Sequence, residues 1–153
     1  MNAEVDLYPR PVVASGIFEL SVPPDEAFPL FTAAGEERWI DDWRPTHLGA
    51  KEPQSKGLVF ITGSAAERTI WTVLETDRAK GRLAYSRVTP ESRAGIVEVE
   101  LLARGKGTAV KVTYTMTALS SETSAHLHQF APKRYPTMLE EWRTMINGTL
   151  GLD

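Results

Sequence analysis

The C-terminal segment, residues 135–150, limits what the rest of the chain can fold into. Its large apolar residues recur at spacings of three and four, which places them on one face of an α-helix; they are Met138, Leu139, Trp142, Met145, Ile146 and Leu150. Pro136 suits the first helical turn, and Gly151 can end the helix. An amphipathic helix needs an apolar surface to cover, so the preceding residues must supply one.

Strand-like segments supply that surface. Apolar residues alternate with polar ones, the period of a strand with one buried face, over residues 14–22, 67–76, 82–88, 95–104 and 108–119, and residues 58–64 form a further strand. Such alternation is typical of an antiparallel sheet with one face in water. We expect an α+β fold in which a curved antiparallel sheet of six or seven strands wraps around the C-terminal helix. The first strand should pair with the last.

The connecting segments contain short helices and one long loop. Residues 24–33 predict a helix after Pro23 and Pro24, although Pro29 lies inside it. Residues 36–40 predict a second short helix, and residues 122–130 a third, capped by Ser120 or Ser121. Residues 39–57 lack a clear period and predict a loop. It is longer than an ordinary connection, and such long loops are often functional. We expect residues 1–13 to form an N-terminal arm and residues 14–153 a single domain.

Composition narrows the function classes. The 153 residues carry a net charge of −3 with no basic run, which argues against a nucleic-acid surface. The chain has no cysteine, so it has no disulfide, thiolate nucleophile or cysteine metal site. No signal-peptide pattern or membrane span of roughly 20 apolar residues is present. We expect a soluble cytoplasmic protein that uses no cofactor.

Several motifs resemble one known superfamily. They are the opening FELSVPPDEAFPLF, Trp39 shortly after it, the turn DRAKGRL, the hairpin LLARGKGTAVKVTYTM and the closing YPTMLEEWRTMI. In this order the motifs are similar to the START-like, helix-grip proteins, or SRPBCC superfamily, which include polyketide cyclases/dehydrases and Aha1-C-terminal-like proteins. The resemblance covers residues 14–150. It implies a hydrophobic pocket between the sheet and the last helix, but no single activity.

The alternation assigns side chains to the face that the helix covers. From that face, the helix and the long loop, we select a ligand-binding set: Trp39, Trp71, Tyr85, Arg87, Val99, Tyr114, Met138 and Trp142. These residues form an apolar lining with a few polar atoms, which is typical of small-molecule sites. The alternative is that they fill the space and leave no cavity.

Arg87 is the most informative charged residue. By parity it shares a face with Leu83 and Tyr85. One interpretation is that it points inward and binds a ligand carboxylate or polarises a ketone, because a buried charge needs a partner. The other is that it lies at the end of its strand and reaches solvent. Tyr85 and Tyr114 could donate hydrogen bonds to a ligand, or to backbone carbonyls instead.

Other polar residues point less clearly to chemistry. The long loop contains Trp39, Asp41, Asp42, Trp43 and His47. Its aspartates and histidine could act as acid–base groups or bind a metal. The simpler interpretation is that they are solvated loop residues. His126 and His128 would point about 200° apart on a helix, so they cannot share a metal. Glu98 and Glu100 fall on the wet face. We therefore name no catalytic residue and no metal site.

Three functional hypotheses follow. The first is a binding protein for a small or medium hydrophobic molecule held between the sheet and the last helix. The second is a polyketide cyclase/dehydratase-like enzyme that uses the same cavity, which would need two titratable groups converging inside it. The third is a protein-interaction module without a small ligand, which would expose an apolar patch. The sequence leaves a homodimer open.

Overall fold

The computed structural model describes residues 10–49 and 51–152. Most of the expected arm, residues 1–9, lies outside the described residues. The element order is β1 (Val12–Leu20), α2 (Pro24–Ala27), η1 (Phe28–Phe31), η2 (Gly35–Arg38), β2 (Thr46–Leu48), β3 (Val59–Ser64), β4 (Glu67–Asp77), β5 (Arg82–Thr89), β6 (Arg93–Arg104), β7 (Gly107–Ala118), η3 (Ser121–Phe130) and α3 (Tyr135–Leu150). The first strand thus begins two residues before the expected domain boundary.

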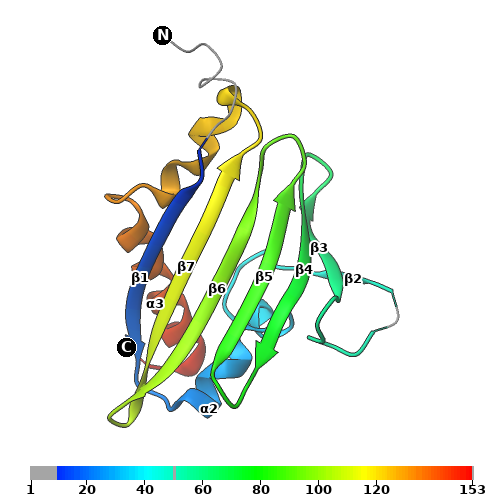
Figure 1. The fold of residues 1–153 in the computed structure, drawn as a ribbon. Helices are drawn as coiled ribbons and strands as arrows, with labels where there is room; N and C mark the ends of the chain where they lie inside the picture. Colours follow the sequence, from blue (N-terminus) through cyan, green and yellow to red (C-terminus); the bar gives the residue numbers. More distant parts are fainter. Residues whose placement is uncertain (1–9, 50, 153) are drawn as a thin grey trace.

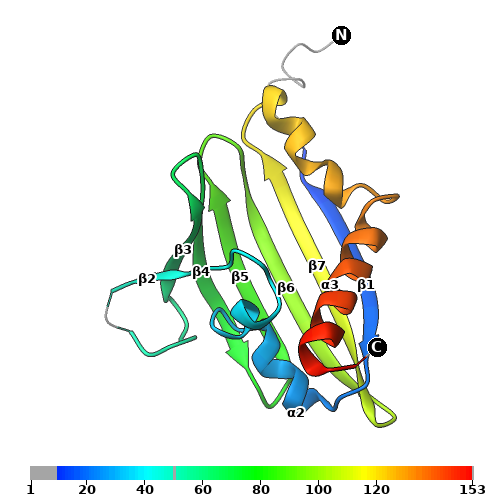
Figure 2. The same ribbon diagram turned by 180° about the vertical axis from the view of Figure 1, so that it is seen from behind.

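The strands form one antiparallel sheet in the order β1-β7-β6-β5-β4-β3-β2. Strands β3 to β7 form a meander, and β1 pairs with β7, as the sequence predicts. Figures 1 and 2 show a curved sheet with α2, η3 and α3 all on one side of it. The predicted fold class, a curved antiparallel sheet around a long C-terminal helix, is confirmed.

Two local predictions need correction. The helix expected over residues 24–33 is a four-residue α-helix followed by a 3₁₀ turn, because Pro29 has no N–H with which to continue an α-helical ladder. The loop expected over residues 39–57 contains the short edge strand β2, which pairs with β3. Its three residues are all exposed, so the sequence has no alternation of buried and exposed residues that would predict this strand.

The core lies between the concave face of the sheet and α3. Buried side chains come from the predicted inward positions of β4 to β7, and α3 contributes Tyr135, Leu139 and Ile146. A Cβ atom at Gly16 of β1 would lie 2.6 Å from Cδ1 of Leu139, so a glycine allows the helix to approach the strand closely. Met145, expected on the apolar face, is 37% exposed. In the part of the chain that the structure describes, no helix has the length and apolarity of a membrane span.

Candidate functional site

Arg87 lies on the concave face of the sheet, at the middle of a row of paired residues. The strand register places it opposite Trp71 of β4 on one side and Gly95 of β6 on the other. Only 9% of Arg87 is exposed, and its guanidinium carbon lies 5.0 Å from the centroid of the Trp71 ring. The interpretation in which Arg87 reaches solvent is therefore wrong, because β5 continues two residues beyond it and neighbouring side chains cover it.

The positive charge of Arg87 is poorly compensated. Among the described residues, none places a carboxylate oxygen within 4.0 Å of its guanidinium, and its Nε is buried without a hydrogen-bond partner. Burial lowers the pKa of Arg87, while the neighbouring Tyr114 hydroxyl, which interacts with the guanidinium, partly opposes that shift. Burying a cation with an unpaired hydrogen-bond donor costs free energy unless an acceptor oxygen pairs with that donor.

Two further titratable groups face the same region. Burial raises the pKa of Tyr114 on β7 to about 12, with the nearby Glu36 adding to the shift and Arg87 opposing it. Burial also raises the pKa of Glu36 on η2 well above its usual range, although the positive charge of Arg87 opposes that shift. The Glu36 residue is half-buried. Glu36, Arg87 and Tyr114 thus lie close enough to influence one another electrostatically.

Sequence reasoning did not select Glu36. It occurs in the polar run Gly35–Arg38, where Glu37 and Arg38 are exposed. Nothing in the spacing of that run distinguishes the enclosed glutamate from its solvated neighbours. Its position close to Arg87 depends on how η2 docks over the sheet, which is a long-range feature.

Tyr85 bonds to a backbone carbonyl, which is one of the two roles that the sequence leaves open for it. Its hydroxyl donates a hydrogen bond of 2.6 Å to the carbonyl oxygen of Phe31 and accepts one of 2.7 Å from Nε2 of Gln54. Burial, with Glu36 nearby, raises its pKa well above the ordinary value. A ligand could donate to the remaining lone pair of this hydroxyl, but it could accept from the hydroxyl only by displacing Phe31.

The tryptophans of the long loop pack into the core. The indole N–H of Trp39 donates to the Leu30 carbonyl at 2.7 Å, and its ring meets the edge of Trp142 on α3 at a centroid distance of 5.3 Å. The indole N–H of Trp43 donates to the Ala33 carbonyl at 2.7 Å, and its ring contacts Trp71 at 5.5 Å. Aromatic side chains therefore fill part of the concave face.

The other predicted residues lie farther from Arg87. Val99 is buried on β6, four residues along the strand from Gly95, or about 13 Å. Met138 is half-buried on α3 and packs against the core. Within the predicted ligand-binding set, ring contacts connect Trp71 with Tyr85, Tyr114 with Trp142 and Trp142 with Trp39, and Arg87 lies over Trp71 beside Tyr114. A cavity bounded by all eight residues stays a prediction.

The loop residues proposed for acid–base or metal chemistry lie at the surface. Asp41, Asp42 and His47 are exposed, and His47 only approaches the Phe60 ring, at a centroid distance of 5.6 Å. Within residues 10–49 and 51–152, no group of three histidine, aspartate or glutamate side chains could hold a metal ion. These observations agree with the interpretation of solvated loop residues.

No protein-family model and no curated protein matches the sequence. Several solved structures are similar. Norcoclaurine synthase from Thalictrum flavum, in complex with dopamine and hydroxybenzaldehyde, has a TM-score of 0.66 at 7% identity, over 95% of this chain and 92% of that one. A Thermobifida fusca protein has a TM-score of 0.60 at 20% identity, over 80% and 84%. CalU16 from Micromonospora echinospora has a TM-score of 0.55 at 17% identity, over 90% and 87%.

These identities are low, so the similarities establish a shared fold and not a shared activity. The shared fold is the helix-grip fold, a curved antiparallel sheet with a C-terminal helix, as the sequence predicts. What the interior binds must be argued from the side chains of this chain.

Proposed function

We propose that this protein binds a small or medium-sized apolar molecule that carries one anionic or carbonyl oxygen, between the sheet and α3. The observation that supports this proposal is the buried guanidinium of Arg87. It lies beside Trp71 and Tyr114, and its Nε donor has no partner. A ligand oxygen that accepts from this group would satisfy the donor and compensate the charge.

The energetics favour such a ligand over a neutral apolar one. A hydrogen bond to a charged group contributes about 1.5–3 kcal/mol, which corresponds to a factor of about 10 to 150 in affinity. The aromatic side chains around Arg87 exclude water, which strengthens the electrostatic attraction. Apolar contacts would supply general affinity, and Arg87 would select ligands by their oxygen group.

A matched pair of fluorescent probes tests this proposal. The probe 8-anilinonaphthalene-1-sulfonate carries an anion, whereas N-phenyl-1-naphthylamine has nearly the same apolar body without it. We expect the wild-type protein to bind the anionic probe at least about tenfold more tightly, and Arg87→Met to remove that preference while it retains binding of the neutral probe. Probe fluorescence and quenching of the tryptophans report the two affinities.

Arg82→Met is the matched control, since Arg82 is an exposed residue on the same strand. Equal affinity of the two probes for the wild-type protein, or a preference that survives Arg87→Met, would refute the role of Arg87. If neither probe binds, the filled-core alternative would replace the proposal. Native mass spectrometry of the freshly purified protein would identify the class of any molecule that co-purifies.

One observation favours a second candidate function, chemistry on a carbonyl group. The raised pKa of Glu36 lets this carboxyl hold a proton at a pH where an exposed glutamate has lost it, and Arg87 can polarise a carbonyl oxygen. An acid and a cation facing one enclosed region are the pair that a polyketide cyclase/dehydratase-like reaction requires. Norcoclaurine synthase, a structural neighbour, is bound to dopamine and an aldehyde in its solved complex.

Proton exchange on a diketone tests this candidate. We expect the protein to accelerate deuterium incorporation at the central carbon of 1-phenyl-1,3-butanedione, followed by NMR. Glu36→Gln should lower the acceleration at least about tenfold, because it removes the group that transfers the proton. Glu37→Gln, an exposed neighbour on η2, should not change it. Exchange at the uncatalysed rate in wild-type protein would leave binding alone as the function.

A further inference from the structure

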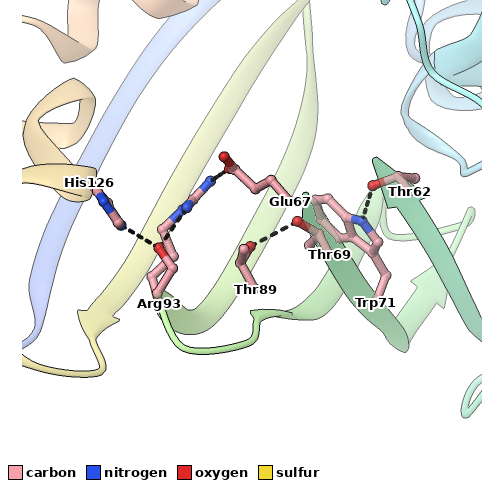
Figure 3. Close-up of polar contacts among 8 residues, drawn as sticks. Thr62, Glu67, Thr69, Trp71, Thr89, Arg93 and His126 are labelled. Carbon is pink, nitrogen blue, oxygen red and sulfur yellow. Dashed lines mark hydrogen bonds and ion pairs between the residues drawn. The ribbon is translucent and has the colours of Figure 1, made fainter. Parts of the chain in front are cut away.

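A second group of polar side chains lies outside the Arg87 region, at the end of the sheet near η3. It lines a surface cleft of about 520 Å³ between the β3–β4 turn, the β5–β6 turn and η3. Its lining includes Glu67, Arg68, Ser92 and His126. Figure 3 shows the polar chain that crosses this end, with His126 at one side, Arg93 in the middle and Glu67 at the other.

Ser92 links His126 to Arg93 in this chain. Its Oγ lies 2.6 Å from Nδ1 of His126 and 2.9 Å from Nη1 of Arg93. A guanidinium nitrogen can only donate, so of these two partners only the imidazole can accept the hydroxyl hydrogen. The arrangement therefore allows a hydrogen bond from Ser92 to His126 when the imidazole hydrogen is on Nε2.

Arg93 is held in position by Glu67. Its Nη2 lies 2.9 Å from Oε1 of Glu67, and its side chain is only 13% exposed. The hydrogen bond and charge of Arg93 lower the pKa of Glu67, so the carboxylate stays ionised and keeps the guanidinium beside Ser92. A fixed positive charge next to a hydroxyl stabilises the alkoxide that forms when the proton leaves.

The backbone before Ser92 is also unusual. Thr89 to Ser92 form a tight turn in which Ser92 N–H donates to the Thr89 carbonyl at 3.0 Å. Glu91, within this turn, has a φ of 67°, a left-handed conformation that costs energy for a residue with a side chain. The turn places Ser92, of which only 8% is exposed, beneath the exposed His126 of η3.

From this geometry we propose that Ser92 is an activated nucleophile and that the cleft accepts small activated acyl esters. In acylation, Oγ of Ser92 bonds to the carbonyl carbon, and its proton moves to Nδ1 of His126. The bond from carbon to the leaving oxygen then breaks, and the leaving group takes the proton. Arg68, which lines the same cleft, supplies a further positive charge for the oxyanion.

Deacylation reverses the roles. A water molecule gives a proton to Nδ1 of His126, and its oxygen bonds to the acyl carbon. The ester bond to Ser92 breaks, and Oγ takes the proton back from the imidazole. The sum is an ester and water converted to an acid and an alcohol, so no further reactant is needed.

Covalent labelling with a fluorophosphonate tests the nucleophile directly. The serine oxygen would bond to phosphorus as fluoride leaves, and peptide mapping by mass spectrometry would locate the adduct. We expect one adduct, on Ser92, in the native protein. His126→Gln should slow labelling at least about tenfold, because a positioned base contributes that much or more.

His128→Gln is the matched control. His128 lies two residues away on η3, is exposed, and has its Nδ1 3.0 Å from the Ala125 carbonyl of its own helix. The variant His128→Gln should be labelled at the wild-type rate. Hydrolysis of 4-nitrophenyl acetate should follow the same order among the variants. No adduct on Ser92, or equal labelling of the two histidine variants, would overturn the proposal.

Ser92→Cys gives a second measurement that does not depend on removing the side chain. The chain has no cysteine, so this thiol would be the sole target of iodoacetamide. Beside His126 and Arg93 it should react at pH 7 at least about tenfold faster than free cysteine, because both neighbours favour the thiolate. Slower reaction than free cysteine would show that the position is closed to reagents and would also overturn the proposal.

Discussion

At the scale of single residues, Arg87 combines a cost in stability with the binding role that we propose for it. Its guanidinium is taken out of water beside the Trp71 ring and the Tyr114 hydroxyl, and among the described residues no carboxylate oxygen lies within 4.0 Å of it. Removing a charge from water costs several kcal/mol, and an aromatic face returns only part of that.

Arg87→Met should therefore stabilise the protein. Methionine retains an apolar stem of similar shape and removes the uncompensated charge, so we expect the free energy of unfolding in urea to rise by about 1 kcal/mol or more. Arg82→Met, which removes an exposed cation 3.8 Å from Glu100, should change it by less than about 0.5 kcal/mol. A clear loss of stability in Arg87→Met would instead make Arg87 a structural residue.

Glu36 should give the protein a distinctive pH dependence. Its pKa is higher in the folded state than in the unfolded state, because burial raises it. The folded state then binds more protons between the two pKa values, so stability falls as pH rises through that window. The slope is up to about 1.4 kcal/mol per pH unit.

Glu36→Gln should remove this dependence. The variant should match the wild type near pH 4, where glutamate is mostly protonated in both states, and should become the more stable of the two as pH rises towards 7. Urea unfolding at both pH values measures the difference. Glu37→Gln, at an exposed position, is the control, and a Glu36→Gln effect that is the same at pH 4 and pH 7 would argue against an enclosed carboxyl.

At the scale of elements, η3 shows a helix whose start is specified locally. Ser120 accepts a hydrogen bond from the Thr123 N–H, and the Thr123 hydroxyl bonds back to the Ser120 N–H. This reciprocal pair confirms the predicted cap at Ser120. The ten residues form a 3₁₀-helix rather than the expected α-helix, and such long 3₁₀ runs are uncommon.

Ser120→Ala should lower the free energy of unfolding by about 1 kcal/mol, because it removes the side chain that caps η3. Ser124→Ala, at an exposed position within the same element, should have little effect. Chemical denaturation followed by circular dichroism compares the two. Equal effects would mean that packing of Leu127 and Phe130, and not the cap, holds η3 in place.

The long loop is a further element whose structure depends on distant contacts. Trp39 and Trp43 each donate an indole hydrogen bond to a carbonyl nine or ten residues earlier, and both rings enter the core. Gln54 then bonds the Tyr85 hydroxyl and the Ala33 N–H. The loop is thus fastened to the sheet by side chains, although it has little regular structure of its own.

At the scale of the whole molecule, stability depends on the closure of the sheet by α3. Ile146 is fully buried on that helix, whereas its neighbour Met145 is 37% exposed. Ile146→Ala should cost about 2–5 kcal/mol in unfolding free energy, since it removes buried methyl groups and leaves a cavity. Met145→Ala should cost less than about 0.5 kcal/mol.

Urea unfolding followed by tryptophan fluorescence and by circular dichroism checks this pair. We expect the two signals to change together, because Trp39 and Trp142 join the loop and α3 into the core that the sheet covers. Similar costs for the two variants would show that α3 is not held by its inward face.

The sequence by itself determined the elements and the faces they bury. Periods of two and of three to four are local properties, so they identified six of the seven strands, the helix from Tyr135 to Leu150, and the inward positions of Trp71 and Tyr114. They left open whether Arg87 points inward or reaches solvent. The exposed strand β2 has no such period and was missed. Turn and cap residues such as Ser120 bond to residues only a few positions away, so the sequence also predicts them.

Only the tertiary structure decided which polar groups meet. Glu36 and Tyr114 are far apart in the sequence, and Ser92 and His126 are separated by 34 positions. Their proximity depends on how η2 and η3 dock onto the sheet. The docking of η2 and η3 depends on many weak contacts among residues that are distant in the sequence, so it cannot be predicted from a periodic pattern. For the same reason the sequence showed an apolar interior but not the glutamic acid beside its arginine.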